Sequence, residues 1–65
     1  MEFEADIKDG KYGRVKIRIE GGKLYVNDKE YELKNIKEVK LVEGLGLNKI
    51  YVNYKGRDIL LIEFT

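Results

Sequence analysis

The stretch RVKIRIEGGKLYV, residues 14–26, alternates apolar and charged side chains on both sides of a glycine pair. Because side chains in a β-strand point alternately to opposite faces, the pattern predicts two strands that each have one apolar face. Gly21 and Gly22 tolerate the positive φ angles of a two-residue hairpin loop. The stretch therefore predicts an antiparallel hairpin in which Ile19 lies opposite Leu24.

The preceding segment, EFEADIK (residues 2–8), has the same alternation. If DGKYG closes a hairpin about Lys11, the apolar residues of both strands share one face. The expected pairs on that face are Phe3 with Ile19, Ala5 with Ile17 and Ile7 with Val15. On the other face, the same register pairs Asp6 with Lys16 and Glu4 with Arg18.

Further strands follow downstream. Asp28 and Lys29 are expected to close a third hairpin in which Val26 faces Tyr31, and NIKE (35–38) to form a short turn before a strand at 38–43. NKIYVNYK and DILLIEF are expected to pair around NYKG as a type I turn. The chain is thus predicted to be one all-β domain, residues 1–65, in which an antiparallel meander of about six to seven short strands closes into a small barrel or β-roll.

The composition excludes several kinds of chemistry. The 65 residues contain no Cys, His or Ser, so neither the usual zinc ligand sets nor a Ser or Cys nucleophile with a His base can be assembled. The acidic residues are scattered, and DIKDG lacks the remaining ligands of a calcium-binding EF-hand loop. We therefore expect a protein that is not an enzyme and has no catalytic residue, metal or cofactor.

The charge is almost balanced, with 13 basic and 12 acidic residues. This gives no overall field that would attract nucleic acid or anionic lipid. The first residues, MEFEADIK, fit neither a signal peptide nor a membrane span, so we expect a cytoplasmic protein without membrane association. The 38% of charged residues, mostly Lys and Glu, is typical of proteins that work at high temperature, and a designed sequence can share this bias.

Two segments break the alternation. EGLGLNK (43–49) places two leucines at a chain reversal, and ILLI (59–62) is apolar on both faces of its strand. These residues either plug an open end of the roll or form an exposed patch that pairs with a second copy or with a protein partner. We favour an interaction module, and its candidate partner-binding residues are Leu45, Leu47, Ile59 and Leu61. GLG is not a phosphate loop, because the required third glycine, or a Gly-Lys-Ser/Thr ending, is missing.

The alternative is weak nucleic-acid binding. KYGRVKIR places three basic residues on one strand face with two tyrosines nearby, as in small barrels that bind single strands. The candidate residues are Arg14, Lys16, Arg18, Tyr12 and Tyr25. Because the predicted register puts Glu4 and Asp6 opposite two of these cations, we favour a solvated ladder of ion pairs over a phosphate site.

The strand rhythm of residues 21–64 resembles that of pleckstrin-homology-like rolls. The features shared are an I-x-x-V step before a strand, here IKEV, and a Y-x-G-R-x-I hairpin, here YKGRDI. This resemblance implies a β-roll, but it carries no lipid- or peptide-binding residue over. The C-terminal helix that plugs such rolls has no counterpart here, which leaves LGL and ILLI to cover the opening. The composition also resembles that of small all-β proteins from Pyrococcus-type hyperthermophilic archaea.

Overall fold

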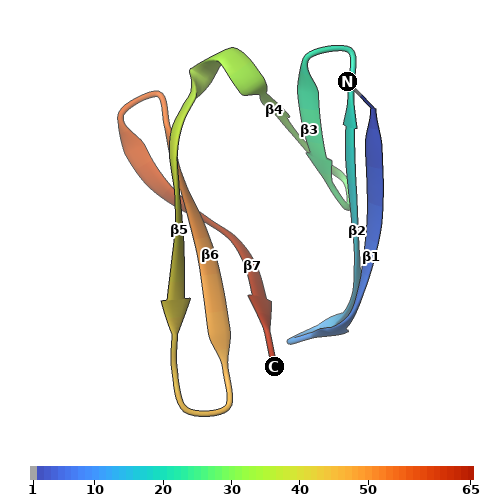
Figure 1. The fold of residues 1–65 in the computed structure, drawn as a ribbon, viewed down its shortest axis with the longest axis vertical. Coiled ribbons are helices and arrows are strands. Elements are labelled where there is room, and N and C mark those ends of the chain that lie inside the picture. Colours follow the sequence, from blue (N-terminus) through green and yellow to red (C-terminus); the bar gives the residue numbers. More distant parts are fainter. Residues whose placement is uncertain (1) are drawn as a thin grey trace.

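The computed structural model describes residues 2–65 and consists of seven antiparallel strands (Figure 1). This confirms the all-β antiparallel class and the expected strand number. No helix among these residues could cross a membrane, since the sole helical segment there is one 3-10 turn. The elements are β1 (Phe3–Gly10), β2 (Gly13–Glu20), β3 (Lys23–Val26), β4 (Lys29–Glu32), η1 (Leu33–Asn35), β5 (Ile36–Glu43), β6 (Asn48–Tyr54) and β7 (Arg57–Phe64).

The strands form two halves of one sheet in the order β4-β3-β2-β1-β7-β6-β5. The halves join where Gly10 of β1 lies opposite Phe64 of β7. The Lys11 N–H also donates to the Glu63 carbonyl at 2.8 Å, and the Thr65 N–H donates to the Asp9 carbonyl at 3.0 Å. Beyond this junction β1 and β7 diverge, so that β1–β4 and β5–β7 stand as two facing layers (Figure 1).

The predicted closure into a barrel is wrong. Closure would require β4 to pair with β5, and over residues 2–65 these strands remain the two free edges of the sheet. The physical reason lies in η1, which is anchored to both halves. The Leu33 N–H donates to the Gly22 carbonyl at 3.0 Å, whereas the Asn35 carbonyl accepts from the Lys55 N–H at 3.1 Å. Because η1 carries the chain from the β2–β3 turn to the β6–β7 turn, β5 starts beside β6 instead of β4.

The core lies between the two layers and draws on both. Its most buried side chains are Leu24, Val26, Tyr31, Val52 and Ile62. The Tyr31 and Tyr54 rings meet edge to face with their centroids 5.3 Å apart, an arrangement that aromatic pairs prefer. Tyr31 is buried within this core, and the half-buried Tyr54 packs against it.

The register of the first two hairpins is confirmed, because all the predicted pairs of β1 with β2 and of β2 with β3 are present. The third hairpin is shifted. Its loop is Asn27-Asp28, so Tyr31 lies opposite Leu24 and not opposite Val26. Asn27 adopts a φ of 51° and ties the loop to β2, where its Oδ1 accepts from the Lys16 N–H at 2.9 Å. Asparagine tolerates this left-handed conformation better than lysine does, so Asn27 suits the loop better than Lys29.

The last hairpin also differs from the expectation. Its loop is Lys55-Gly56, with φ angles of 53° and 81°, and Tyr54 lies opposite Arg57. Positive φ at both loop positions is the signature of a type I′ turn, whose twist matches the flanking strands, whereas a type I turn would splay them. The fifth strand starts at Ile36, two residues earlier than predicted, and the helical turn lies at Leu33–Asn35 before it.

Candidate interaction surface

The most exposed apolar strand is β5, at one edge of the sheet. All its residues except Ile36 are exposed, although it contains two valines and a leucine. Val39 is 66% exposed, Leu41 57% and Val42 48%. We call these three residues the β5 strip. A soluble surface normally carries apolar residues singly, so three in one strand mark a candidate contact site.

The inner residues of the β5 strip continue rows of the core. Val39 lies opposite Val52 of β6, which is 1% exposed, and Leu41 lies opposite Ile50. The residues opposite Val52 and Ile50 on β7 are Ile59 and Ile62, which belong to or pack against the core. In each row, the side chains on β6 and β7 are buried or half-buried, whereas the side chain on β5 is exposed. The covering layer shields β6 and β7 and ends before it reaches β5.

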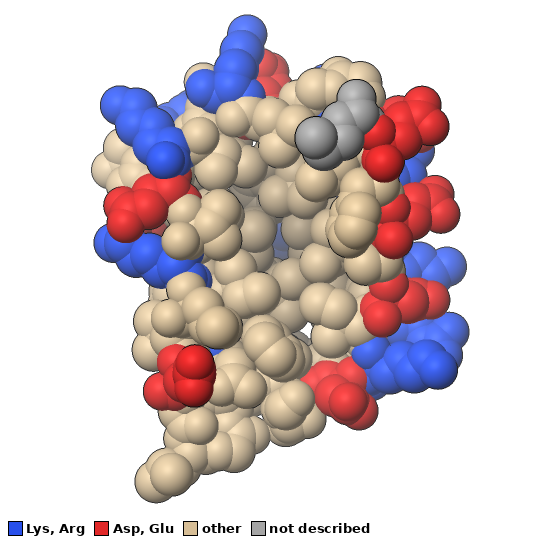
Figure 2. All heavy atoms as spheres, viewed as in Figure 1, with Lys and Arg blue, Asp and Glu red and all other residues tan. Residues whose placement is uncertain are grey.

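The backbone of β5 adds to this surface. Seven of its eight residues pair with β6 on one side, and on the other side no strand within residues 2–65 pairs with it. Unpaired N–H and C=O groups along a strand edge are a template for another strand. The space-filling view shows charged side chains along the two margins of the molecule, with mostly uncharged surface between them (Figure 2).

The β5–β6 loop carries two of the predicted partner-binding residues. Leu45 is fully exposed and Leu47 is half-buried, so Leu45 does not plug the roll. The backbone conformation of this loop explains why it contains two glycines. Gly46 has a φ of 79°, and a Cβ on Gly44 would lie 2.6 Å from the Leu47 carbonyl oxygen. The loop thus reverses tightly, and it leaves Leu45 beyond the end of the β5 strip.

The other two predicted partner-binding residues, Ile59 and Leu61, are half-buried and pack against the core. The four predicted residues therefore do not form one exposed patch. The cause is a bulge in β7, since Ile50 pairs with Ile62 and Tyr51 pairs with Leu60. The extra residue, Leu61, shifts the alternation by one. Leu60 is consequently the residue of ILLI on the outer face, and it is 36% exposed.

The predicted basic face lies on the outer side of β1–β3. Arg14, Lys16 and Arg18 point away from the core, and the Arg18 guanidinium lies 4.2 Å from the centroid of the Tyr25 ring. Tyr12 is exposed at the β1–β2 turn, away from that stack. The structure thus brings Lys16, Arg18 and Tyr25 to the lining of one open groove of about 540 Å³.

Two carboxylates line the same groove as these cations. Glu4 and Asp6 contribute to its lining beside the cations, as the predicted register requires. The ion pairs themselves differ from the expected ladder, because Asp6 pairs with Arg14 at 3.8 Å and Arg18 pairs with Glu20 at 3.0 Å. A groove that carries both signs of charge has little net attraction for a phosphate backbone.

Among residues 2–65 no charged side chain is buried, and no group of three or more acidic side chains could hold a metal ion. Comparisons with protein-family models, with curated proteins and with solved structures found no match to this chain.

Proposed function

We propose that this protein is a non-enzymatic interaction module of the cytoplasm that binds protein through the β5 strip and the adjoining Leu45. The observation that carries this proposal is the coincidence of exposed apolar side chains with a free strand edge on β5. Either feature alone has an ordinary structural explanation. Together they match the requirements of strand addition, in which a partner forms backbone hydrogen bonds to an edge and places alternate side chains against it.

The energetics support contact with another protein. Complete burial of one valine or leucine side chain contributes about 1.5–3 kcal/mol, and Val39, Leu41 and Val42 remain largely outside the core. A partner that covers them gains part of this free energy and also satisfies the backbone groups of β5. The sequence-based choice of Ile59 and Leu61 as contact residues is replaced by Val39 and Leu41, because the former already pack against the core.

The outer groove of β1–β3 supports nucleic-acid binding less well. The stack of Arg18 on Tyr25 is a feature that single-strand binders use, but Glu4 and Asp6 line the same groove. Binding there would require these carboxylates to approach phosphates, which costs affinity.

Selection of displayed peptides against the native protein would test the proposed function. We expect extended peptides with alternating apolar residues to be enriched, and their binding to shift the backbone amide signals of β5. Val39→Lys should abolish this binding. Tyr12→Lys is the matched control, because it replaces a more exposed apolar ring at the far side of the β1–β7 junction.

Two outcomes would contradict the proposal. Signals that move along the groove of β1–β3 instead of β5 would place binding at the basic face. The absence of any selected peptide, together with no effect of β5 variants on self-association, would remove the β5 strip as an interaction site.

A further inference from the structure

The geometry of β5 constrains which strand can bind beside it. When two identical strands pair in antiparallel fashion, a two-fold axis relates them and each contact away from the axis occurs twice. Residues directly opposite each other project from the same face of the sheet. On β5, Val39 and Leu41 project to the inner face with Val52 and Ile50, whereas Glu38 and Lys40 project to the outer face.

Only an axis that passes through a residue keeps inner residues opposite inner residues, because a shift of one position would exchange the faces. Within the regular part of β5, residues 38–43, this leaves an axis at Val39, Lys40, Leu41 or Val42. The four registers differ in which charges they bring together. Side-chain pairing can therefore discriminate between them.

The axis at Val39 is the one that charge favours. It places Val39 opposite its copy on the inner face and sets Glu38 opposite Lys40 twice on the outer face. An axis at Lys40 would place two like charges directly opposite each other, which is unfavourable. It would also bring Lys37 opposite Glu43, but Lys37 is the extra residue where β5 shifts register against β6, so it lies outside the regular ladder. An axis at Leu41 would set Val39 against the carboxylate of Glu43, and an axis at Val42 would set Leu41 against it.

On the outer face of β5, Lys40 has an acidic partner among the described residues of its own chain, whereas Glu38 has no basic partner there. The Lys40 Nζ lies 3.4 Å from an oxygen of Asp58, and the other Asp58 oxygen accepts from the Asn53 amide at 3.3 Å. Glu38 forms no ion pair within residues 2–65. Pairing about Val39 would place Lys40 between Asp58 of its own chain and Glu38 of the second copy. Each Glu38 would thereby gain a cation.

We propose that the occupant of the β5 edge is a second copy of this chain, paired antiparallel through β5 with the two-fold axis at Val39. This inference rests on the proposed function, because it assigns a partner to the same edge. Pairing joins the two open sheets into one continuous sheet and removes a free edge from each copy. The contact area of two such strands is small, so dimer formation should depend on protein concentration.

Disulfide trapping tests both the partner and the register. The chain has no cysteine, so an introduced cysteine is its only thiol. Opposite Cβ atoms in paired strands lie about 4.5–5.5 Å apart, close to disulfide geometry. Val39→Cys should therefore form a covalent dimer under mild oxidation several times faster than Lys40→Cys. Leu45→Cys controls for random collision, because Leu45 is fully exposed but lies away from the axis.

A charge exchange tests the outer-face pairs independently. Glu38→Lys places lysines opposite lysines and should lower the dimer fraction in sedimentation experiments. Adding Lys40→Glu to this variant restores opposite charges across the axis and should recover the dimer. Amide spectra of dilute samples establish that each variant keeps the monomer fold, so loss of the dimer cannot be attributed to unfolding.

The outcomes separate this inference from the proposed function. If Val39→Cys crosslinks no faster than Leu45→Cys while peptides still bind at β5, the second copy is overturned as the occupant and the interaction module stands. If peptides also fail to bind, both fail. If Lys40→Cys crosslinks fastest, the register at Val39 is wrong. Rapid trapping at Val39 with recovery by the charge exchange supports the full inference.

Discussion

The two edges of the sheet, β4 and β5, differ in nearly every property that governs association. β4 has four residues, KEYE, and directs its one apolar side chain, Tyr31, into the core. β5 has eight residues and exposes three apolar side chains. Short length and charge are the common means by which proteins protect a sheet edge. The chain uses both on β4, and on β5 it relies on charged side chains alone.

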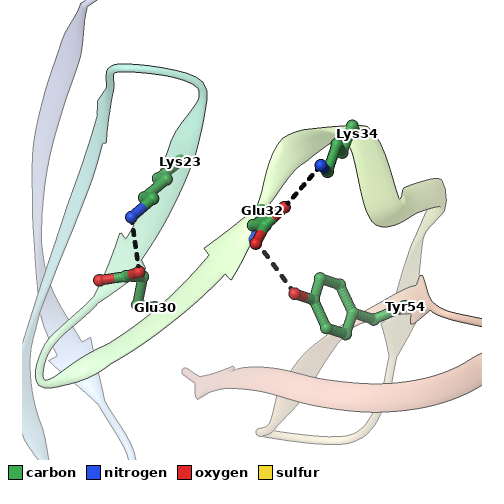
Figure 3. Close-up of polar contacts among 5 residues, drawn as sticks. All are labelled: Lys23, Glu30, Glu32, Lys34 and Tyr54. Atoms are coloured by element: carbon green, nitrogen blue, oxygen red, sulfur yellow. Dashed lines mark hydrogen bonds and ion pairs between the residues drawn. The ribbon is translucent and has the colours of Figure 1, made fainter.

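The end of β4 is also held by neighbouring groups (Figure 3). The Glu32 N–H donates to the Tyr54 hydroxyl oxygen at 3.2 Å, and the Glu32 carboxylate lies 3.2 Å from the Lys34 Nζ. Glu30 pairs with Lys23 of the neighbouring strand at 3.0 Å. Two chemically different edges in one small sheet show that apolar exposure on β5 does not follow from being an edge strand.

The largest expected difference between the two edge strands is the loss of stability when an inward-facing side chain of each is truncated. Tyr31→Ala removes a buried ring that contacts Tyr54, and we expect it to lower the free energy of unfolding by about 3–5 kcal/mol. Val39→Ala at the equivalent face of β5 should cost less than about 1 kcal/mol, because that side chain is 66% exposed. Urea denaturation of dilute samples measures both. Similar losses would show that the β5 strip is part of the core.

Tyr54→Phe tests the hydrogen bond that holds the end of β4. The substitution keeps the ring that packs on Tyr31 and leaves the Glu32 N–H without its acceptor. We expect a loss of about 1 kcal/mol in the free energy of unfolding and faster amide exchange at Glu32. Tyr51→Phe on the outer face of β6 is the matched control, and it should change neither quantity. An unchanged exchange rate at Glu32 would show that this bond does not secure the edge.

Replacing the inner residues of the β5 strip should change association more than stability. The double variant Val39→Lys with Leu41→Lys is expected to alter the free energy of unfolding by within about 0.5 kcal/mol at low protein concentration. Its apparent mass at high concentration should fall to that of the monomer. Sedimentation and urea denaturation of the same samples provide the two readings. A large loss of stability with no change in mass would assign these residues to folding instead of binding.

The smallest expected effect is a change in the pKa of Lys23, which forms an ion pair with Glu30 of β4. The hydrogen bond from Lys23 to Glu30 raises the pKa of the Lys23 ammonium above its ordinary value of 10.5. A raised lysine pKa stabilises the fold below pH 10.5, and this contribution disappears as the pH rises through the raised pKa. Glu30→Gln should move the pKa of Lys23 back towards 10.5 in an NMR titration. No such movement would mean that the pair does not form in solution.

Some of the fold could be predicted because its causes are local. The alternation in residues 2–26 and the glycine pair at 21–22 indicate both the apolar faces and the register of the first two hairpins. The later loops were harder to place, since Asn27 and Lys55 take the positive φ angles for which glycine is the usual signal. The apolar run ILLI indicates that β7 departs from regular alternation, but it does not identify Leu61 as the extra residue of the bulge.

The all-β class, the number of strands, the apolar face of most strands and the absence of thiol and imidazole groups could all be predicted from the sequence. These properties follow from side-chain periodicity and composition, which act over a few residues. Long-range packing determines that the sheet stays open, that Ile59 and Leu61 are packed against the core and that Val39 and Leu41 are not. Coverage of a residue depends on how far the opposite layer extends. That extent is set by the η1 crossover and the divergence of β1 from β7, contacts between residues distant in the chain.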